Sequence, residues 1–266
     1  MAHAYDLAVV GSGPGGYAAA LAAARRGLRV GLIEQAQVGG VCLNVGCIPT
    51  KALVAVALAV RRLQQAPRLG LLVHGFDIDY PAVLARNARI VTTLRRGLTD
   101  VLKREQVELV QGSAAFEDAH RLVVSDEGRS RTLDAERVIL ATGARPLPGS
   151  WTIDEQRILS YRGLLLLPAI PASLLIIGGG VIGCEFASVF SAFGTQVTIV
   201  EQQPQLLPME DPEAVRYLAR RLEADGVTIL TGTAIQRLET SPDGVTATLK
   251  DGARHQAQRC LIAIGQ

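Results

Sequence analysis

A strand, a glycine-rich turn and a helix follow one another near the start of this chain, and this pattern constrains its fold most. An apolar strand at 7–10 leads into the turn Gly11-Ser12-Gly13-Pro14-Gly15-Gly16. An alanine-rich helix at 17–26 and a second strand at 28–33 come next. Glycines in such a turn let the backbone approach a pyrophosphate, whose charge the helix N-terminus favours. The pattern predicts a dinucleotide-binding βαβ unit.

The same order of elements recurs in the middle of the chain. A strand at 174–177 precedes the turn Gly178-Gly179-Gly180-Val181-Ile182-Gly183, and a helix at 184–193 and a strand at 196–200 follow it. The alternative for either turn alone is a glycine-rich loop of an unrelated fold. The repetition favours an α/β chain with two Rossmann-like dinucleotide-binding domains.

An acidic residue follows the second strand of each copy, at the same distance from the first glycine. These residues are Glu34 and Glu201, and a carboxylate at this position can accept hydrogen bonds from ribose hydroxyls. Glu201 would repel a 2′-phosphate, and the next residues are Gln202 and Gln203 rather than arginine. The second domain is therefore expected to prefer NAD over NADP. The alternative is an ordinary solvated carboxylate at a strand end.

Two cysteines, Cys42 and Cys47, stand in the glycine-containing run at 39–51. In a regular helix, residues five apart have Cα atoms roughly 8 to 9 Å apart, beyond the roughly 7 Å limit for a disulfide. A bridged pair therefore excludes a continuous helix over both. Gly46 and Pro49 favour a helix that starts near Cys47, where its N-terminus stabilises a thiolate. The alternative is two buried structural thiols.

The remaining two cysteines, Cys184 and Cys260, lie in apolar segments without a neighbouring cysteine, so inert packing is expected for both. The basic residues are scattered and the formal net charge is +2, which argues against nucleic acid as a partner. The most apolar stretch, 164–177, contains two prolines and is too short to cross a bilayer. With four cysteines and no signal-peptide pattern at 1–10, a cytoplasmic location is expected.

The chain between the two copies is expected to hold two helices and three short strands. The helices are predicted at 50–65 and 80–104, and the strands, taken as a small meander, at 107–110, 122–124 and 137–140. The second domain is expected to continue with a helix at 213–224 and strands at 227–230, 245–249 and 260–264. Prolines and a glycine at 146–149 divide the chain into a first domain at 1–148 and a second at 149–266.

The run Gly39-Gly40-Val41-Cys42-Leu43-Asn44-Val45-Gly46-Cys47-Ile48-Pro49-Thr50-Lys51 resembles the redox segment of dihydrolipoyl dehydrogenases, in the class I pyridine nucleotide-disulfide oxidoreductases. The tripeptide Ala141-Thr142-Gly143 and the run at 207–211 are similar to further motifs of that family. Glutathione and mercuric reductases are similar, but they usually have Val-Asn and Val-Pro where this chain has Leu43-Asn44 and Ile48-Pro49.

The resemblance assigns a role to each residue of the expected site. It implies that Cys42 exchanges with the substrate dithiol, that Cys47 faces the flavin, and that Lys51 lies beside the flavin and pairs with Glu185 near the nicotinamide. The motifs and the resemblance together give FAD contacts at Gly11, Gly13, Gly15, Gly16, Glu34, Gly40, Lys51, Ala114, Thr142 and Gly143. They give NAD contacts at Gly178, Gly180, Val181, Ile182, Gly183, Glu201 and Gly265.

The resemblance also implies an activity, in which electrons pass from dihydrolipoyl groups through the Cys42–Cys47 disulfide and FAD to NAD⁺. The partners would be lipoyl groups of 2-oxo acid dehydrogenase or glycine cleavage complexes, and the family forms homodimers. The family's interface domain, with its His-Glu base pair, has no counterpart in this sequence. None of His3, His74, His120 and His255 precedes a proline, as the family's base histidine does, so all four are expected to be surface residues.

Two other functions remain open for this chain. One is a mercuric or other disulfide reductase of the same architecture, and the other is a non-catalytic dinucleotide-binding fragment. Because the interface domain has no counterpart here, the chain alone is expected to bind FAD weakly. It is also expected to pass electrons from NADH to artificial acceptors better than it turns over lipoamide.

Overall fold

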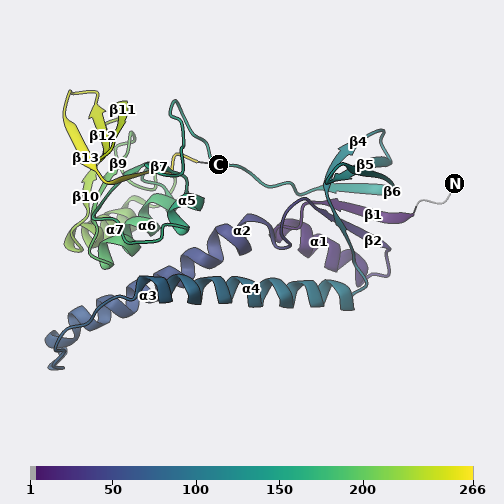
Figure 1. Cartoon of the computed structure of the whole chain (residues 1–266), viewed down its shortest axis with the longest axis horizontal. Helices are drawn as coiled ribbons and strands as arrows, with labels where there is room; N and C mark the ends of the chain where they lie inside the picture. Colours follow the sequence, from purple (N-terminus) through teal and green to yellow (C-terminus); the bar gives the residue numbers. More distant parts are fainter. Residues whose placement is uncertain (1–3, 266) are drawn as a thin grey trace. The chain divides into compact units, whose positions relative to one another are not determined.

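The computed structural model describes residues 4–265 and divides the chain into two compact units (Figure 1). Unit one holds the chain up to Pro49 together with Ala88–Ala144, and unit two holds Thr50–Asn87 and the chain from Arg145 onward. These units place residues 50–87 with the second part of the chain, whereas the predicted domain boundary places them with the first. The boundary at 148, which assigns FAD to the first part of the chain and NAD to the second, stays a prediction.

Unit one contains a six-stranded sheet of order β3-β2-β1-β6-β5-β4, in which β1 (Tyr5–Val10) is one of the two middle strands. Helix α1 (Pro14–Ala24) packs on β1 and β2 (Val30–Glu34), where Leu7 and Val9 meet Ala20 and Ala23. Successive side chains of a strand point to opposite faces, so Ala8 lies in a second apolar cluster. The predicted strands of the first copy are confirmed, and helix α1 begins at Pro14 rather than at residue 17.

The expected meander exists, but its composition differs from the prediction. Strand β3 (Glu108–Gln111), predicted to belong to the meander, pairs parallel with β2 at the edge of the sheet. The antiparallel strands are β4 (Ser113–Phe116), β5 (Arg121–Asp126) and the first half of β6 (Arg129–Leu140). The second half of β6 pairs parallel with β1, so this one strand serves both parts of the sheet.

The segment with the two cysteines forms two helices rather than one. Helix α2 (Gly40–Val45) ends at Gly46, which has φ −137° and ψ −110°, and helix α3 (Cys47–Gln65) begins at the next residue. The prediction that no continuous helix covers both cysteines is confirmed, as is the start of the second helix at Cys47. The short helix α2 was not predicted. Helix α4 (Tyr80–Arg104) has the predicted bounds.

Unit two repeats the βαβ pattern in a five-stranded parallel sheet of order β10-β9-β8-β14-β7. Its central strand leads into α6 through the second glycine turn, as β1 leads into α1. The elements are β7 (Ile158–Leu159), α5 (Tyr161–Leu165), β8 (Ser173–Ile177), α6 (Val181–Ala192), β9 (Gln196–Val200), α7 (Pro212–Ala224), β10 (Thr228–Leu230) and β14 (Arg259–Ile262).

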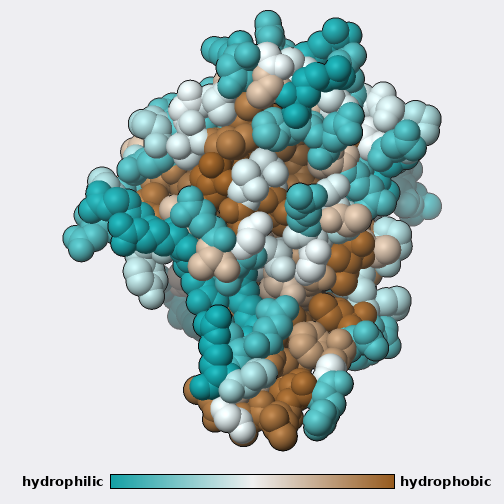
Figure 2. Space-filling view, turned by 90° about the vertical axis from the view of Figure 1, so that its left-hand side faces the viewer, coloured by the Kyte–Doolittle hydropathy of each residue, from teal (hydrophilic) through white to brown (hydrophobic). Residues whose placement is uncertain are grey.

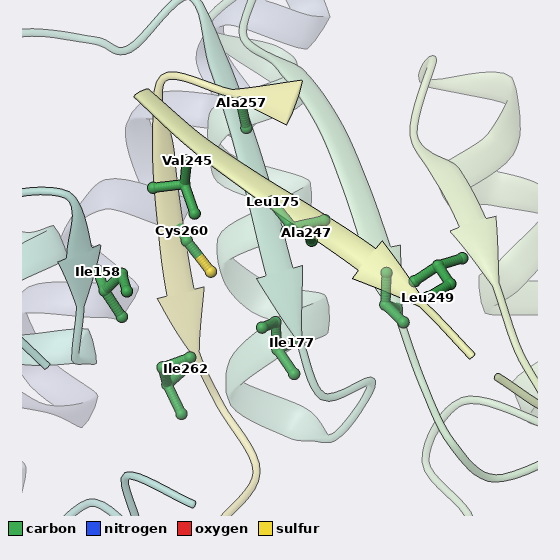
Figure 3. Close-up of a cluster of buried hydrophobic side chains, with 10 residues drawn as sticks. Ile158, Leu175, Ile177, Val245, Ala247, Leu249, Ala257, Cys260 and Ile262 are labelled. Atoms are coloured by element: carbon green, nitrogen blue, oxygen red, sulfur yellow. The ribbon is translucent and has the colours of Figure 1, made fainter. Parts of the chain in front are cut away.

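A separate three-stranded antiparallel sheet packs on one face of this parallel sheet (Figure 3). It consists of β11 (Ile235–Ser241), β12 (Gly244–Leu249) and β13 (Arg254–Ala257). Val245 and Ala247 of β12 face Leu175 of β8 and Cys260 of β14, and these side chains form a buried apolar cluster. Cys260 is fully buried there, which confirms the expectation of an inert packing role.

Apolar residues also reach the surface of unit two, on the face drawn in Figure 2. The run Gly40–Leu69, which ends with the 3₁₀ helix η1 (Ala66–Leu69), is long and apolar enough by length and composition to span a membrane. Only 28% of that apolar window is buried inside the structure, and Leu69 is 78% exposed. The expected absence of a membrane partner stays a prediction.

Candidate functional site

The three fingerprint glycines of unit one have three different surroundings. A Cβ on Gly11, whose φ is +98°, would lie 2.2 Å from the Ala141 carbonyl oxygen. A Cβ on Gly16 would lie 1.8 Å from the Gly11 carbonyl oxygen, so this glycine lets helix α1 approach the strand. A Cβ on Gly13 would meet nothing within 4 Å. The second glycine of the fingerprint therefore borders open space, as a position that a pyrophosphate approaches should.

Unit two repeats these surroundings at its own fingerprint. A Cβ on Gly178, with φ +109°, would lie 2.4 Å from the Ala263 carbonyl oxygen, and one on Gly183 would lie 2.1 Å from the Gly178 carbonyl oxygen. A Cβ on Gly180 would meet nothing within 4 Å. Gly13 and Gly180 are also the N-caps of α1 and α6, and neither helix has a side-chain cap or an acidic residue in its first turn. Both helix N-termini thus suit a phosphate group.

In each unit, the residue after a neighbouring parallel strand donates a hydrogen bond to the last residue of the strand before the glycine turn. The Ala141 N–H donates to the Val10 carbonyl at 2.8 Å in unit one, and the Ala263 N–H donates to the Ile177 carbonyl at 2.8 Å in unit two. This contact brings Thr142 to the first glycine turn, where its Cα atom lies 3.2 Å from the Cβ position of Gly11, and the flavin contacts expected of Thr142 and Gly143 stay predictions. In unit two, the chain after β14 reaches the second glycine turn, with the Ile264 nitrogen 3.1 Å from the Cβ position of Gly178. The predicted contact residue Gly265 is the next residue in the chain.

Glu34 is held by backbone and side-chain donors of the first turn. Its Oε2 accepts hydrogen bonds from the Ser12 N–H at 3.0 Å and the Ser12 hydroxyl at 2.6 Å, and its Oε1 accepts one from the Ala36 N–H at 2.8 Å. A carboxylate has about four acceptor sites, so capacity for a ribose hydroxyl remains. The predicted contact residue Ala114 lies two residues after Gly112. The Gly112 N–H donates to the Glu34 carbonyl at 2.9 Å, so this part of the chain begins beside Glu34.

Glu201 has the same bonding pattern in unit two. Its Oε2 accepts from the Gly179 N–H at 2.6 Å, and its Oε1 accepts from the Gln203 N–H at 2.8 Å. These donors stand 22 residues before and two residues after the carboxylate, as Ser12 and Ala36 do around Glu34. The duplication seen in the sequence therefore extends to individual hydrogen bonds. Each carboxylate thus holds its turn in shape, and its contact with a ribose stays a prediction.

The cysteine pair lies next to the first glycine turn. Gly40, at the start of α2, has φ +61°, and a Cβ there would lie 2.6 Å from the Gly13 Cα atom. Cys42 is half-buried, whereas Cys47 is exposed at the start of α3. The predicted disulfide and the predicted roles of the two thiols stay predictions.

Lys51 forms an ion pair with Glu185, as the resemblance implies. Lys51 lies one turn after Cys47 on α3, and Glu185 lies in the second turn of α6. The Lys51 side chain is 59% exposed and that of Glu185 is 27% exposed. The neighbour of Glu185 is the buried residue Cys184, where burial, followed by the Glu201 charge, raises the thiol pKa to about 11. That thiol is neutral near pH 7 and packs as an inert group, as predicted.

The other predicted residues occupy less distinctive positions. Val181 is exposed and Ile182 is half-buried in the first turn of α6, so their backbone N–H groups belong to the helix N-terminus. His74 and His120 are exposed, as expected, and His255 is half-buried on β13. His3 lies outside the described residues.

Sequence reasoning missed three polar residues that support the site. Ser12 is fully buried, donates to Glu34 and accepts from the Gly39 N–H at 3.1 Å. Asn44, between the two cysteines, and Arg95 of α4 are joined by a hydrogen bond of 2.8 Å. A serine as the second residue of the fingerprint is a usable signal, because its hydroxyl can reach the acidic residue. The sequence holds no comparable signal for Arg95.

Comparison with known proteins agrees with this geometry. Residues 5–266 match the family model described as pyridine nucleotide-disulphide oxidoreductase. Dihydrolipoyl dehydrogenases from Zymomonas mobilis subsp. mobilis and Bacillus subtilis are 40% and 37% identical, over 100% and 98% of this chain. Among solved structures, LpdA from Mycobacterium tuberculosis has a TM-score of 0.89 at 30% identity, covering 97% of this chain. The flavoprotein disulfide reductase RclA from Escherichia coli, as its Cu(II) complex, has 0.84 at 31%, covering 100%. The chain spans 57–58% of the length of these relatives.

Proposed function

This chain belongs to the pyridine nucleotide-disulphide oxidoreductase family, and we propose that it forms the FAD- and NAD-binding parts of a dihydrolipoyl dehydrogenase. The proposed reaction oxidises a dihydrolipoyl dithiol to its disulfide and reduces NAD⁺ to NADH with release of one proton. The proposed partners are lipoyl groups of 2-oxo acid dehydrogenase or glycine cleavage complexes, in the cytoplasm.

The duplicated glycine turn, with its bound carboxylate, is the observation that carries this proposal. Gly13 and Gly180 border open space, while the flanking glycines meet backbone atoms, so both turns fit a pyrophosphate. Of the two turns, the first is the one beside the Cys42–Cys47 pair, because Gly40, two residues before Cys42, lies against Gly13. FAD is therefore assigned to unit one and NAD to unit two.

The chain's own residues account for the sulfur chemistry. A dihydrolipoyl thiolate attacks the Cys42 sulfur, the Cys42–Cys47 bond breaks, and the second dihydrolipoyl thiol displaces Cys42 to close the lipoyl disulfide. Two thiols of the chain then carry two electrons and their protons, and Cys47 stands at the N-terminus of α3. FAD, when bound, supplies the two-electron acceptor between this pair and NAD⁺. Lys51 and Glu185 keep a paired charge one helical turn beyond Cys47.

Alanine substitutions at the two open glycines test this assignment. Gly13→Ala is expected to weaken FAD binding roughly tenfold or more and to leave NADH binding unchanged, whereas Gly180→Ala should do the reverse. Both changes should preserve the fold, because the added methyl meets no protein atom within 4 Å and φ is −64° or −73°. Calorimetric titration of the purified chain with FAD and with NADH measures both affinities.

Gly27→Ala is unsuited as a control because φ is +82° there, so Gly97→Ala, on α4 and also in open space, is the matched control. A Gly13→Ala variant with unchanged FAD affinity would refute the flavin site. Preference of the reconstituted protein for another disulfide over lipoamide would favour a different reductase of the same architecture. Binding of both dinucleotides without any thiol–disulfide exchange at Cys42 would indicate a non-catalytic fragment.

A further inference from the structure

Arg95, on helix α4 in unit one, bonds to two side chains of the redox segment. Its Nε donates to Asn44 Oδ1 at 2.8 Å, and its Nη1 donates to Gln37 Oε1 at 2.8 Å. Within residues 4–265, no carboxylate lies within ion-pair distance of this half-buried guanidinium. Its contacts are therefore directed to amide oxygens, and only a planar group with several donors can reach both at once.

Asn44 also forms hydrogen bonds to the loop that precedes α2. Its Nδ2 lies 2.9 Å from the Gly40 carbonyl oxygen, 3.0 Å from that of Val38 and 3.3 Å from that of Gln37. Three carbonyls around the nitrogen and a guanidinium beside the oxygen leave one satisfactory orientation of the amide. Asn44 stands between Cys42 and Cys47 in the chain, so it fixes the segment on which both thiols are carried.

The loop held by Asn44 is in turn attached to the first glycine turn. The Gly39 N–H donates to Ser12, whose hydroxyl donates to Glu34 at 2.6 Å. Gly39 and Gly40 have φ values of +100° and +61°. Glycine permits such values but also many others, so the hydrogen bonds rather than the two glycines fix the conformation of this loop. Arg95 thus anchors a continuous path of hydrogen bonds from α4 through the redox segment to the dinucleotide turn.

We propose that Arg95 is a positioning residue that sets the redox equilibrium of the Cys42–Cys47 pair by fixing Asn44 and the loop at 37–40. This inference rests on the proposed function of the pair. An anchored segment holds the two thiols close together, which raises their effective concentration toward each other. Disulfide formation becomes more favourable, and the pair becomes more reducing. Loss of the anchor loosens the dithiol and makes the disulfide more oxidising.

Equilibration with mixtures of lipoic and dihydrolipoic acid measures this equilibrium. The reaction exchanges one disulfide for another: two protein thiols and lipoic acid give the protein disulfide and dihydrolipoic acid. Alkylation, followed by mass analysis of the Cys42 and Cys47 peptides, gives the oxidised fraction. Arg95→Met should lower the equilibrium constant for disulfide formation 5- to 30-fold, where tenfold is about 30 mV for this two-electron couple.

Three further variants separate positioning from folding. Arg95→Lys, which keeps the charge but reaches one oxygen at a time, should shift the constant about 2- to 5-fold, so it rescues in part and serves if Arg95→Met does not fold. Asn44→Asp, which loses the amide donors while Arg95 stays, should shift it as Arg95→Met does. Arg96→Met, the exposed neighbour on α4, should leave it unchanged.

The outcomes distinguish this inference from the function on which it rests. If the unsubstituted chain forms no Cys42–Cys47 disulfide in any mixture, the proposed function fails and the inference fails with it. If it forms the disulfide but folded Arg95→Met and Arg95→Lys titrate within twofold of it, only the role of Arg95 is overturned.

Discussion

At the scale of single residues, Glu34 and Glu201 hold the duplicated glycine turns in shape. Each carboxylate accepts hydrogen bonds from a turn residue 22 positions earlier and from the N–H two positions later. Glu201 is only 8% exposed, so loss of its oxygens would leave the Gly179 N–H without this acceptor. Substitution at this residue is therefore expected to change both the proposed coenzyme site and the stability of the turn.

Glu201→Ala is expected to reduce the preference for NADH over NADPH. The unsubstituted chain should bind NADH more tightly by about 1 to 3 kcal/mol, because a charge-assisted contact to ribose replaces repulsion of a 2′-phosphate. Calorimetry with both coenzymes gives the difference for each protein. Gln203→Ala, which retains the N–H that bonds to Glu201, should keep the original preference. Equal preference in Glu201→Ala and the unsubstituted chain would contradict the role of this carboxylate.

The four cysteines are expected to react with iodoacetamide in an order set by exposure and ionisation. Cys47 is exposed and should be alkylated first, whereas Cys184 and Cys260 are buried and should react only on unfolding. Burial raises the Cys184 pKa to about 11, so the native state resists ionising this thiol. Because the folded pKa is raised, this contribution to stability is complete below the unfolded pKa near 9 and is lost as the pH rises toward 11.

Peptide mass mapping after short exposure at pH 8 identifies the labelled cysteines, and thermal melts from pH 8 to 11 give the stability. Cys184→Ala should lose less stability over that pH range than the unsubstituted chain. Early labelling of Cys184 at pH 8, where the protein is folded, would show that the α6 core is more open than the structure indicates.

At the scale of elements, α3 is attached to α6 and α7 by one arginine. Arg61 of α3 donates to the Ser188 carbonyl at 2.8 Å and to the Ser191 hydroxyl at 3.1 Å, and it pairs with Asp225, which follows α7. The Arg61 and Asp225 side chains are only 12% and 15% exposed. Arg221 shares the same carboxylate. Asp225 therefore balances two guanidinium groups, one of them largely removed from water.

Arg61→Met is expected to lower the free energy of unfolding by about 1 to 3 kcal/mol, because it removes hydrogen bonds but leaves Asp225 paired with Arg221. Asp225→Asn should lower it more, by about 3 to 5 kcal/mol, because Arg61 then keeps a largely buried charge without its partner. Urea unfolding followed by the fluorescence of Trp151, the single tryptophan, measures both in unit two. Arg62→Met, an exposed neighbour, should change it by less than about 0.5 kcal/mol. A larger loss in Arg61→Met than in Asp225→Asn would contradict this charge balance.

The elements also show where prediction from the sequence succeeds and where it fails. The two βαβ copies were found because buried strands and glycine turns follow local rules. Strands β11 and β13 were not found, since Ile235–Ser241 and Arg254–Ala257 are largely polar and acquire their pairing from β12. Strand β3 was placed in the wrong part of the sheet because partner choice depends on the crossover through α4, which no local pattern records. The polar contacts of Arg95 are equally non-local.

At the scale of the whole molecule, the chain passes between its units three times, twice within helices α3 and α4 and once in the loop that follows β6. Residues 50–87 belong to unit two, where Tyr80 lies edge-on to Phe193 with ring centroids 6.1 Å apart, and Arg61 bonds to α6. Tyr80 is 3% exposed, and burial raises its pKa to about 12. Unit two is thus completed by residues 50–87, which are separated in the chain from the rest of that unit by Ala88–Ala144 of unit one.

A fragment of residues 149–266 is therefore expected to be less stable than the same residues in the whole chain. Loss of the Tyr80 ring alone should cost about 3 kcal/mol or more, the usual effect of removing a buried aromatic side chain. Urea unfolding monitored by Trp151 compares the fragment with the whole chain. Equal unfolding midpoints would support residue 148 as a true domain boundary and would contradict the compact units.

With the ribose contact proposed for it, Glu201 has both a structural and a binding role, and these two roles determine the order in which a lineage can change its coenzyme. A mutation at this codon alone removes the acceptor of the Gly179 N–H, so a destabilised protein arises before any affinity for a 2′-phosphate is gained. Gln202 and Gln203 are exposed, and Gln203 contributes only its backbone N–H to the carboxylate. An arginine can therefore arise at either position at little cost in stability. Descendants that use NADP should have acquired that arginine first and lost the glutamate later.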